Sequence, residues 1–236
     1  MRWAFSLSLF ALLASPALKL LIRSRERAEL QVSLFLLLLG AGLGLRIGAV
    51  EGVHIAVAPN ALGHAALSLA AIPLFLFTRA VFRPSEPWAR WLATGGIVGS
   101  FAALPLLAAD GGFASETAPS LLAVNSFRAL ACAWSCAEAI RYHRLMRRQA
   151  ALGLVDRVLV DRFRLWSIWM GALTVQFGFI LAIRIAGRLT GHGLESWPTV
   201  IPIVRGGMAV TMLVAMLALT LTFSPPRVYQ RWLARA

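Results

Sequence analysis

Seven apolar segments of about twenty residues constrain the fold of this chain more than any other feature. An α-helix of that length crosses roughly 30 Å of membrane hydrocarbon. The mean hydropathy of +0.74 and the charged fraction of 14% agree with a membrane protein, because soluble domains carry about 25% charged residues. The segments cover residues 3–22, 30–50, 61–82, 90–109, 119–141, 164–187 and 199–223. We therefore predict an all-α protein, a polytopic seven-helix transmembrane bundle that occupies residues 1–236 as a single domain.

The first segment has two interpretations. Arg2 precedes an apolar stretch, and Ala14-Ser15-Pro16-Ala17 resembles the cleavage site of a secretory signal peptide. Cleavage would leave the basic residues between Lys19 and Arg27 outside the cell, against the positive-inside rule. We favour a retained first span with a short outer N-terminus.

The connections between the segments alternate in charge, and this alternation predicts the orientation. Residues 23–29 and 79–90 are basic, and residues 141–164 carry seven arginines against two aspartates. The intervening connections hold at most one basic residue each. Basic connections stay in the cytoplasm, so we predict an outer N-terminus and an inner C-terminus. Lys19 is the only lysine, an arginine bias typical of a GC-rich genome, and we expect a bacterial protein of the cell inner membrane.

The inner face is predicted to consist mainly of a basic loop, 142–163, and a basic tail, 224–236. Apolar residues at helical spacing between Val155 and Phe163 indicate that the flanking span helices continue into the loop. Arginines at 227, 231 and 235 predict a short amphipathic helix lying on the inner leaflet. The net charge of +13 is therefore assigned to contacts with membrane lipids and not to nucleic acid.

Polar residues inside apolar segments are costly and mark candidate functional sites. Arg128 is the deepest of four arginines in the predicted outer halves of the spans and shares a helical stripe with Asn125 and Cys132. His64 and Ser68 are one turn apart at the outer end of another span. We predict an outward-facing pocket for an anionic or amphipathic ligand, because a guanidinium binds carboxylate or phosphate through two parallel bonds. Its predicted ligand-binding residues are Arg46, His64, Asn125, Arg128, Gln176, Arg184 and Arg205.

Alternatives to the pocket stay open. The arginines could extend to the membrane surface or pair with the outer acids Glu51, Asp110, Glu116 and Glu195. The outer histidines His54, His64 and His192 show no recognisable metal-ligand spacing, and we predict no metal site. Cys132 and Cys136 are expected to be packed thiols. No catalytic or cofactor motif is present, so we predict no enzyme activity and name no cofactor.

Small residues recur four apart in two segments, at Gly40, Gly44 and Gly48 and at Gly95 and Gly99. They indicate close helix packing within one bundle, with a dimer face as the alternative.

We expect a receptor- or sensor-like protein that binds its ligand from outside and couples to a cytoplasmic partner through 141–164 and 227–235. In size and number of spans the chain resembles the seven-span sensor modules that precede some bacterial histidine kinases, although no kinase follows the last span. One alternative is a small transporter for an anionic solute, with helices broken at Pro73, Pro105, Pro202 and Gly206-Gly207. The other is an accessory subunit of a membrane complex.

Overall fold

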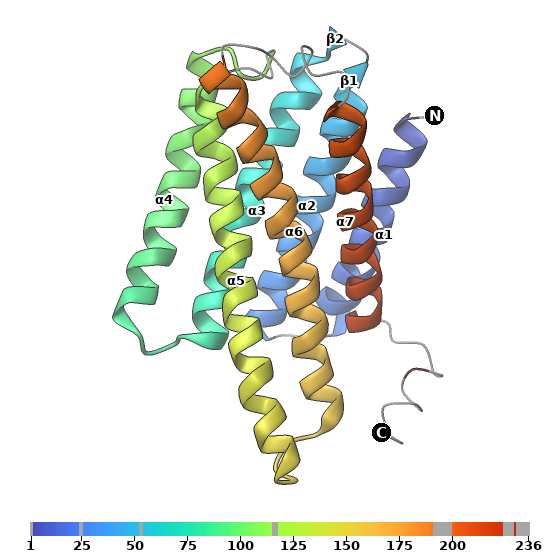
Figure 1. Ribbon diagram of the computed structural model, residues 1–236, viewed down its shortest axis with the longest axis vertical. Coiled ribbons are helices and arrows are strands. Elements are labelled where there is room, and N and C mark those ends of the chain that lie inside the picture. Colours follow the sequence, from blue (N-terminus) through green and yellow to red (C-terminus); the bar gives the residue numbers. More distant parts are fainter. Residues whose placement is uncertain are drawn as a thin grey trace. The chain divides into compact units, whose positions relative to one another are not determined.

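Helices account for nearly all of the described chain in a computed structural model that describes residues 2–23, 26–51, 54–114, 118–190, 200–223 and 229. The helices are α1 (Arg2–Arg23), α2 (Arg27–Ala49), α3 (Val57–Phe82), α4 (Pro87–Ala109), α5 (Ser120–Ala151), α6 (Arg157–Thr190) and α7 (Val200–Phe223) (Figure 1). Two short strands, β1 (Val50–Glu51) and β2 (His54–Ile55), pair antiparallel between α2 and α3. The chain forms two compact units, Met1–Ala131 and Cys132–Ala236, and each is described by itself.

The prediction of an all-α fold class is confirmed, since β1 and β2 have only two residues each, and each of the seven apolar segments corresponds to one helix. Within the described residues, α2, α3, α4 and α6 are long and apolar enough to cross a membrane. These four helices indicate a membrane protein. α5 is less hydrophobic than these four helices, because it carries Asn125 and Arg128 in its first half and four arginines between Arg141 and Arg148 in its second. The seven-span topology and its orientation stay predictions.

In the first unit, α2 packs against both α1 and α3, and α3 packs against α4. Glycines permit these contacts, as the sequence predicted for α2. A Cβ on Gly44 would lie 3.3 Å from the Ser6 carbonyl oxygen of α1, so the two backbones approach closely there. A small core of alanine, leucine and valine side chains joins the end of α4 to the start of α5.

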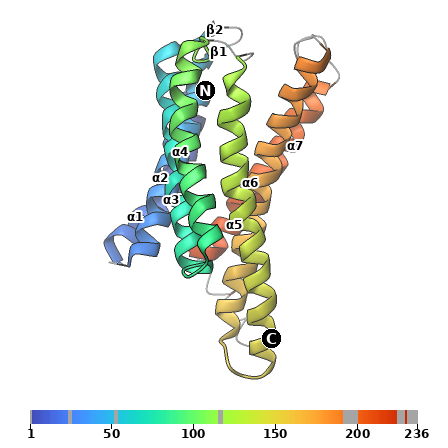
Figure 2. The ribbon, with the colours of Figure 1, turned by 90° about the vertical axis from the view of Figure 1, so that its left-hand side faces the viewer.

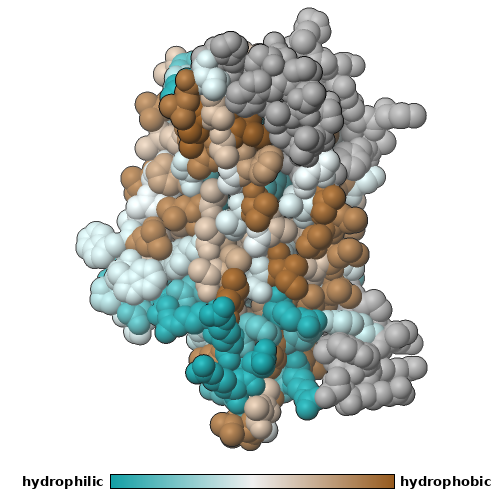
Figure 3. Space-filling model, viewed as in Figure 1, coloured by the Kyte–Doolittle hydropathy of each residue, from teal (hydrophilic) through white to brown (hydrophobic). Residues whose placement is uncertain are grey.

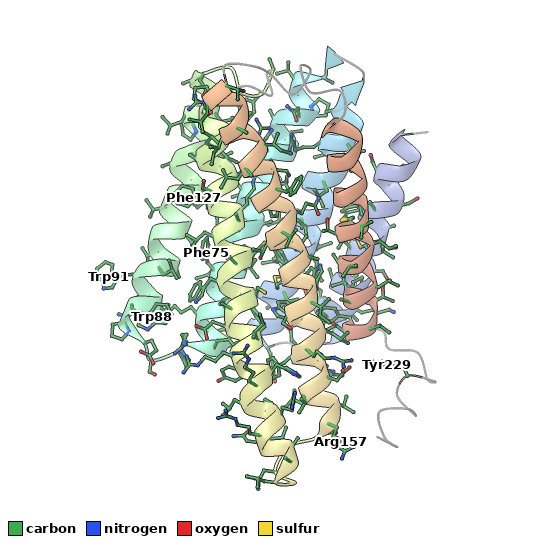
Figure 4. The ribbon with its side chains drawn as sticks, viewed as in Figure 1. Phe75, Trp88, Trp91, Phe127, Arg157 and Tyr229 are labelled. Carbon is green, nitrogen blue, oxygen red and sulfur yellow. The ribbon has the colours of Figure 1, made fainter. Side chains whose placement is uncertain are left out.

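Two aromatic rings of the first unit pack on α4. Phe75 of α3 and Phe127 of α5 both point towards α4 (Figure 4), where Gly96 and Gly99 leave room for them. The third glycine of this region, Gly95, faces open space instead. The α4 glycines therefore accommodate side chains, whereas Gly44 of α2 accommodates a backbone.

The helix breaks predicted for a transporter are not present in the described helices. α3 continues through Pro73 and α4 through Pro105. Pro202 lies in the first turn of α7, where a missing N–H leaves no bond unmade, and α7 continues through Gly206. α3, α4 and α7 are therefore continuous at these prolines and glycines.

In the second unit, α5 and α6 form a long antiparallel hairpin (Figure 2). Trp166 Nε1 donates to Ser135 Oγ at 3.1 Å, and the Tyr142 and Phe163 rings lie 5.6 Å apart nearer the turn. Gly153, with φ of +72°, supplies the left-handed conformation that the turn needs. α7 packs against α6.

The stretch 142–163, predicted as a loop, is largely helical in the structure. Only Leu152–Asp156 lies outside α5 and α6. This agrees with the helical spacing of its apolar residues, which predicted that the neighbouring helices continue into it. Of the predicted amphipathic tail 224–236, the structure describes Tyr229 alone, so the tail helix lies outside the described residues.

Candidate functional site

A buried polar stripe runs along α3 in the first unit. Asn60, His64 and Ser68 follow one another at intervals of four residues, so they lie on one face of the helix. Their side chains are only 1%, 0% and 3% exposed. We call these three residues the α3 stripe. Three buried polar residues in a helix otherwise rich in alanine, leucine and phenylalanine require hydrogen-bond partners from the helices around them.

Arg128 of α5 supplies the donors for the lower part of the α3 stripe. Arg128 is 3% exposed, and its Nη2 donates to the His64 carbonyl oxygen at 2.8 Å and to Ser68 Oγ at 3.0 Å. The same Nη2 lies 3.4 Å from His64 Nδ1. Arg128 therefore joins α5 to α3 through one nitrogen, and its charge sits among neutral acceptors of α3.

Asn125, one turn before Arg128 on α5, completes this contact. Arg128 Nη1 donates to Asn125 Oδ1 at 3.3 Å, so the two residues of the predicted stripe are also joined by a hydrogen bond. Asn125 is 1% exposed. Its Nδ2 amide is buried and has no hydrogen-bond partner in the part of the chain that the structure describes. The Asn125 amide N–H donor next to the guanidinium therefore has no acceptor among the described residues.

Arg46 of α2 meets the upper part of the α3 stripe. Its Nε donates to Asn60 Oδ1 at 3.4 Å, and Asn60 Nδ2 in turn donates to the Phe113 carbonyl oxygen at 2.8 Å. Gly63 of α3 makes this approach possible, because a Cβ there would lie only 2.6 Å from Arg46 Cγ. Two guanidinium groups, one from α2 and one from α5, thus contact a single helix face within two turns.

The connection between α4 and α5 is held beside the α3 stripe by local bonds. Asp110 accepts hydrogen bonds from the backbone N–H of Ser120 at 2.9 Å and of Gly112 at 3.2 Å. The bonds from Ser120 at the start of α5 hold the pKa of this carboxyl below its ordinary value of 3.8. The Phe113 ring that follows lies 6.2 Å from the His64 ring. Asp110 therefore anchors the start of α5, and Phe113 covers the part of the stripe formed by Asn60 and His64.

Four of the seven predicted site residues belong to this arrangement: Arg46, His64, Asn125 and Arg128. Gln176 and Arg184 lie on α6 in the second unit, two turns apart and both half-buried. Arg205 lies in α7, and its side chain is outside the described residues. Of the outer acids considered as arginine partners, Asp110 caps α5, whereas the side chains of Glu51, Glu116 and Glu195 lie outside the described residues.

Sequence reasoning missed Asn60 and Phe113. Asn60 was readable from the sequence, because it stands one turn before His64 and extends the polar spacing to three residues. Nothing in the sequence indicated that the Phe113 carbonyl would reach it, since this bond joins residues 53 positions apart. Among the described residues, no group of three or more His, Cys, Asp or Glu side chains is placed to hold a metal ion.

Comparison with known proteins adds no relative to these observations. No protein-family model, no curated protein and no solved structure matches the chain.

Proposed function

We propose that the chain is a receptor-like membrane protein that binds an anionic ligand at the α3 stripe through Arg46 and Arg128. The ligand would carry a carboxylate or phosphate group, and it would reach the site from the outer side of the membrane. The chain would cross the membrane seven times with its C-terminus in the cytoplasm. Binding would be transmitted to a cytoplasmic partner at the inner face.

The observation that carries the proposal is the placement of the Arg128 guanidinium. It is buried in the first half of α5, next to Asn125 and in contact with two members of the α3 stripe. Polar and ionisable residues within membrane helices are expensive and mostly serve ligand sites, ion pathways or pairing. A guanidinium oriented by fixed hydrogen bonds is also preorganised for a second, incoming acceptor.

The position of Arg46 adds a second basic group for the same ligand. Its contact residue, Asn60, lies one turn from His64, which contacts Arg128. One helical turn is about 5.4 Å along the axis. This spacing suits a small dianion or a headgroup that meets both arginines, and it explains why Gly63 keeps space for the Arg46 stem.

Ligand-dependent thermal stability of the purified protein in neutral detergent tests the proposal. Unfolding would be followed by reaction of a maleimide dye with Cys132, which is 2% exposed in the folded protein. Cys136 is replaced by alanine in all proteins of this assay, because it is a free thiol that is only partly buried. The probes would be succinate, inorganic phosphate and glycerol phosphate, with glycerol as the uncharged control. A bound anion at one hundred times its Kd stabilises by about 2.7 kcal/mol, which is readily measured.

The variants Arg46→Gln and Arg128→Met should lose the stabilisation by the effective anion. Arg90→Gln is the matched control. This substitution also removes one positive charge, but from an exposed residue of α4. Equal stabilisation of the unaltered protein and of all three variants would contradict the proposed site, since the anion would then bind without either arginine. No effect of any charged probe on the unaltered protein would contradict a site for these anion classes.

A further inference from the structure

The far end of the α5–α6 hairpin in the second unit carries a strongly basic surface. We call residues Arg144–Arg162 the hairpin tip. Hydrophilic side chains cover this end of the hairpin, with apolar ones at its extremity (Figure 3). Five arginines of the hairpin tip are exposed: Arg144, Arg147, Arg148, Arg157 and Arg162. None of these five has a carboxylate within ion-pairing distance among the described residues.

The two acids of the hairpin tip are committed to local bonds. Asp156 accepts a hydrogen bond from Val158 N at 3.0 Å and so caps the start of α6. Asp161 is 7% exposed; it pairs with Arg164 at 2.7 Å and accepts the hydroxyl hydrogen bond of Tyr229. Burial, and then this bond to Asp161, raise the pKa of Tyr229. Within the described residues, the two acids of the hairpin tip therefore do little to neutralise its exposed arginines.

Large apolar side chains are exposed between these arginines. Leu152 and Leu154 in the turn are 74% and 72% exposed, and Leu145 and Leu159 on the adjoining helices are 47% and 42% exposed. Such leucines are ordinary on a lipid-facing surface, but here they stand among charged residues. A surface that combines apolar and basic side chains in this way is typical of a protein interface.

Membrane lipids account poorly for the hairpin tip. The 32 residues of α5 extend about 48 Å at about 1.5 Å per residue. The hydrocarbon core takes roughly 30 Å of this length, and the headgroup layer adds only about 5–7 Å on each side. With Ser120 at one edge of the hydrocarbon, Arg148 and Leu152 would lie about 5–13 Å beyond the headgroups on the opposite side. This distance is comparable to the length of about 8–10 Å over which salt screens the lipid charge.

We infer that the hairpin tip is the docking surface for an acidic, amphipathic helical segment of another protein. Glutamate or aspartate side chains of that segment would pair with Arg144, Arg147 and Arg148, and its apolar side chains would cover Leu152 and Leu154. The inference deepens the proposed function, because it states the chemistry of the partner to which the receptor couples. It depends on that proposal only for the side of the membrane on which the hairpin tip lies.

Binding of a designed peptide tests this surface without knowledge of the natural partner or of the outer ligand. The probe is a fluorescein-labelled synthetic helix with glutamate along one face and leucine along its border. Its fluorescence anisotropy would be measured with the full-length protein in nanodiscs of phosphatidylcholine, which carry no net charge. Leu152→Ser with Leu154→Ser should weaken binding by about tenfold or more, because two apolar contacts are lost while the charge is unchanged.

Arg147→Glu with Arg148→Glu should weaken binding at least as much, whereas Arg90→Glu, an exposed residue of the first unit, should change it less than about twofold. Unchanged binding by the leucine variant would overturn the inference, since only diffuse charge attraction would remain. Loss of binding in nanodiscs that contain phosphatidylglycerol would also overturn it, because the hairpin tip would then be a lipid surface. Neither result would bear on anion binding at the α3 stripe, which is measured separately.

Discussion

Replacing Arg128 by methionine separates a ligand site from a structural cross-link. The guanidinium donates hydrogen bonds to the His64 carbonyl, Ser68 Oγ and Asn125 Oδ1, and its Nη2 lies 3.4 Å from His64 Nδ1. Hydrogen bonds to a charged group contribute about 1.5–3 kcal/mol each. Burial of the charge costs several kcal/mol in return. Methionine fills a similar volume with no charge, and the abandoned acceptors are neutral.

The two effects nearly cancel, so we expect Arg128→Met to change the free energy of unfolding by less than about 2 kcal/mol. The same variant should lose all stabilisation by the anion that stabilises the unaltered protein. Arg128→Lys should be the less stable of the two variants, because it keeps the buried charge but loses the planar fork of donors. The assay is thermal unfolding followed by maleimide labelling of the buried Cys132.

A loss above about 3 kcal/mol in Arg128→Met would refute this reasoning. Arg128 would then be a structural tie between α3 and α5, and its burial would need no ligand to explain it. If the anion still stabilised Arg128→Met, Arg128 would not be part of the anion site.

Two further predictions concern the first unit. Because the folded-state pKa of Asp110 lies below the ordinary value of 3.8, its ionised form stabilises the fold above that pH, and this contribution is lost as the pH falls through the folded-state pKa. Thermal melts between pH 6 and pH 3 should therefore fall less steeply for Asp110→Asn than for the unaltered protein, and equal slopes would contradict the role of the carboxylate. Gly96→Ala should destabilise by about 1–3 kcal/mol, because its methyl group would collide with the Phe75 ring. Gly95→Ala is its control, since that position is open; similar losses in both would show that helix packing is not the cause.

The number and position of the helices were predictable from the sequence, because apolar runs of membrane length leave few alternatives to a helix. The polar contact between Asn125 and Arg128 was predictable as well, since it depends only on spacing within one helix. The extension of α5 and α6 beyond the membrane length was indicated by apolar residues such as Leu159. The tight turn at Gly153 was not foreseen.

Contacts between helices were beyond sequence reasoning. His64 and Ser68 were noted as a pair, yet nothing in their spacing indicated that Arg128, 60 or more residues away, would bind both. Arg46 was judged by its depth alone, whereas its position depends on the space that Gly63 leaves in another helix. Such contacts arise from the choice of neighbouring helices, which no local pattern encodes.

Accessibility of two single cysteines tests the central claim most directly, namely that the anion site and the hairpin tip lie on opposite sides of the membrane. In a variant without Cys132 and Cys136, one cysteine would replace Asp110, beside the α3 stripe, or Gly153, in the hairpin turn. Intact cells would be treated with a membrane-impermeant maleimide. We predict that the cysteine at position 110 is labelled at once and that the cysteine at position 153 is labelled only after the membrane is permeabilised. Labelling of position 153 in intact cells, with protection of position 110, would contradict the account.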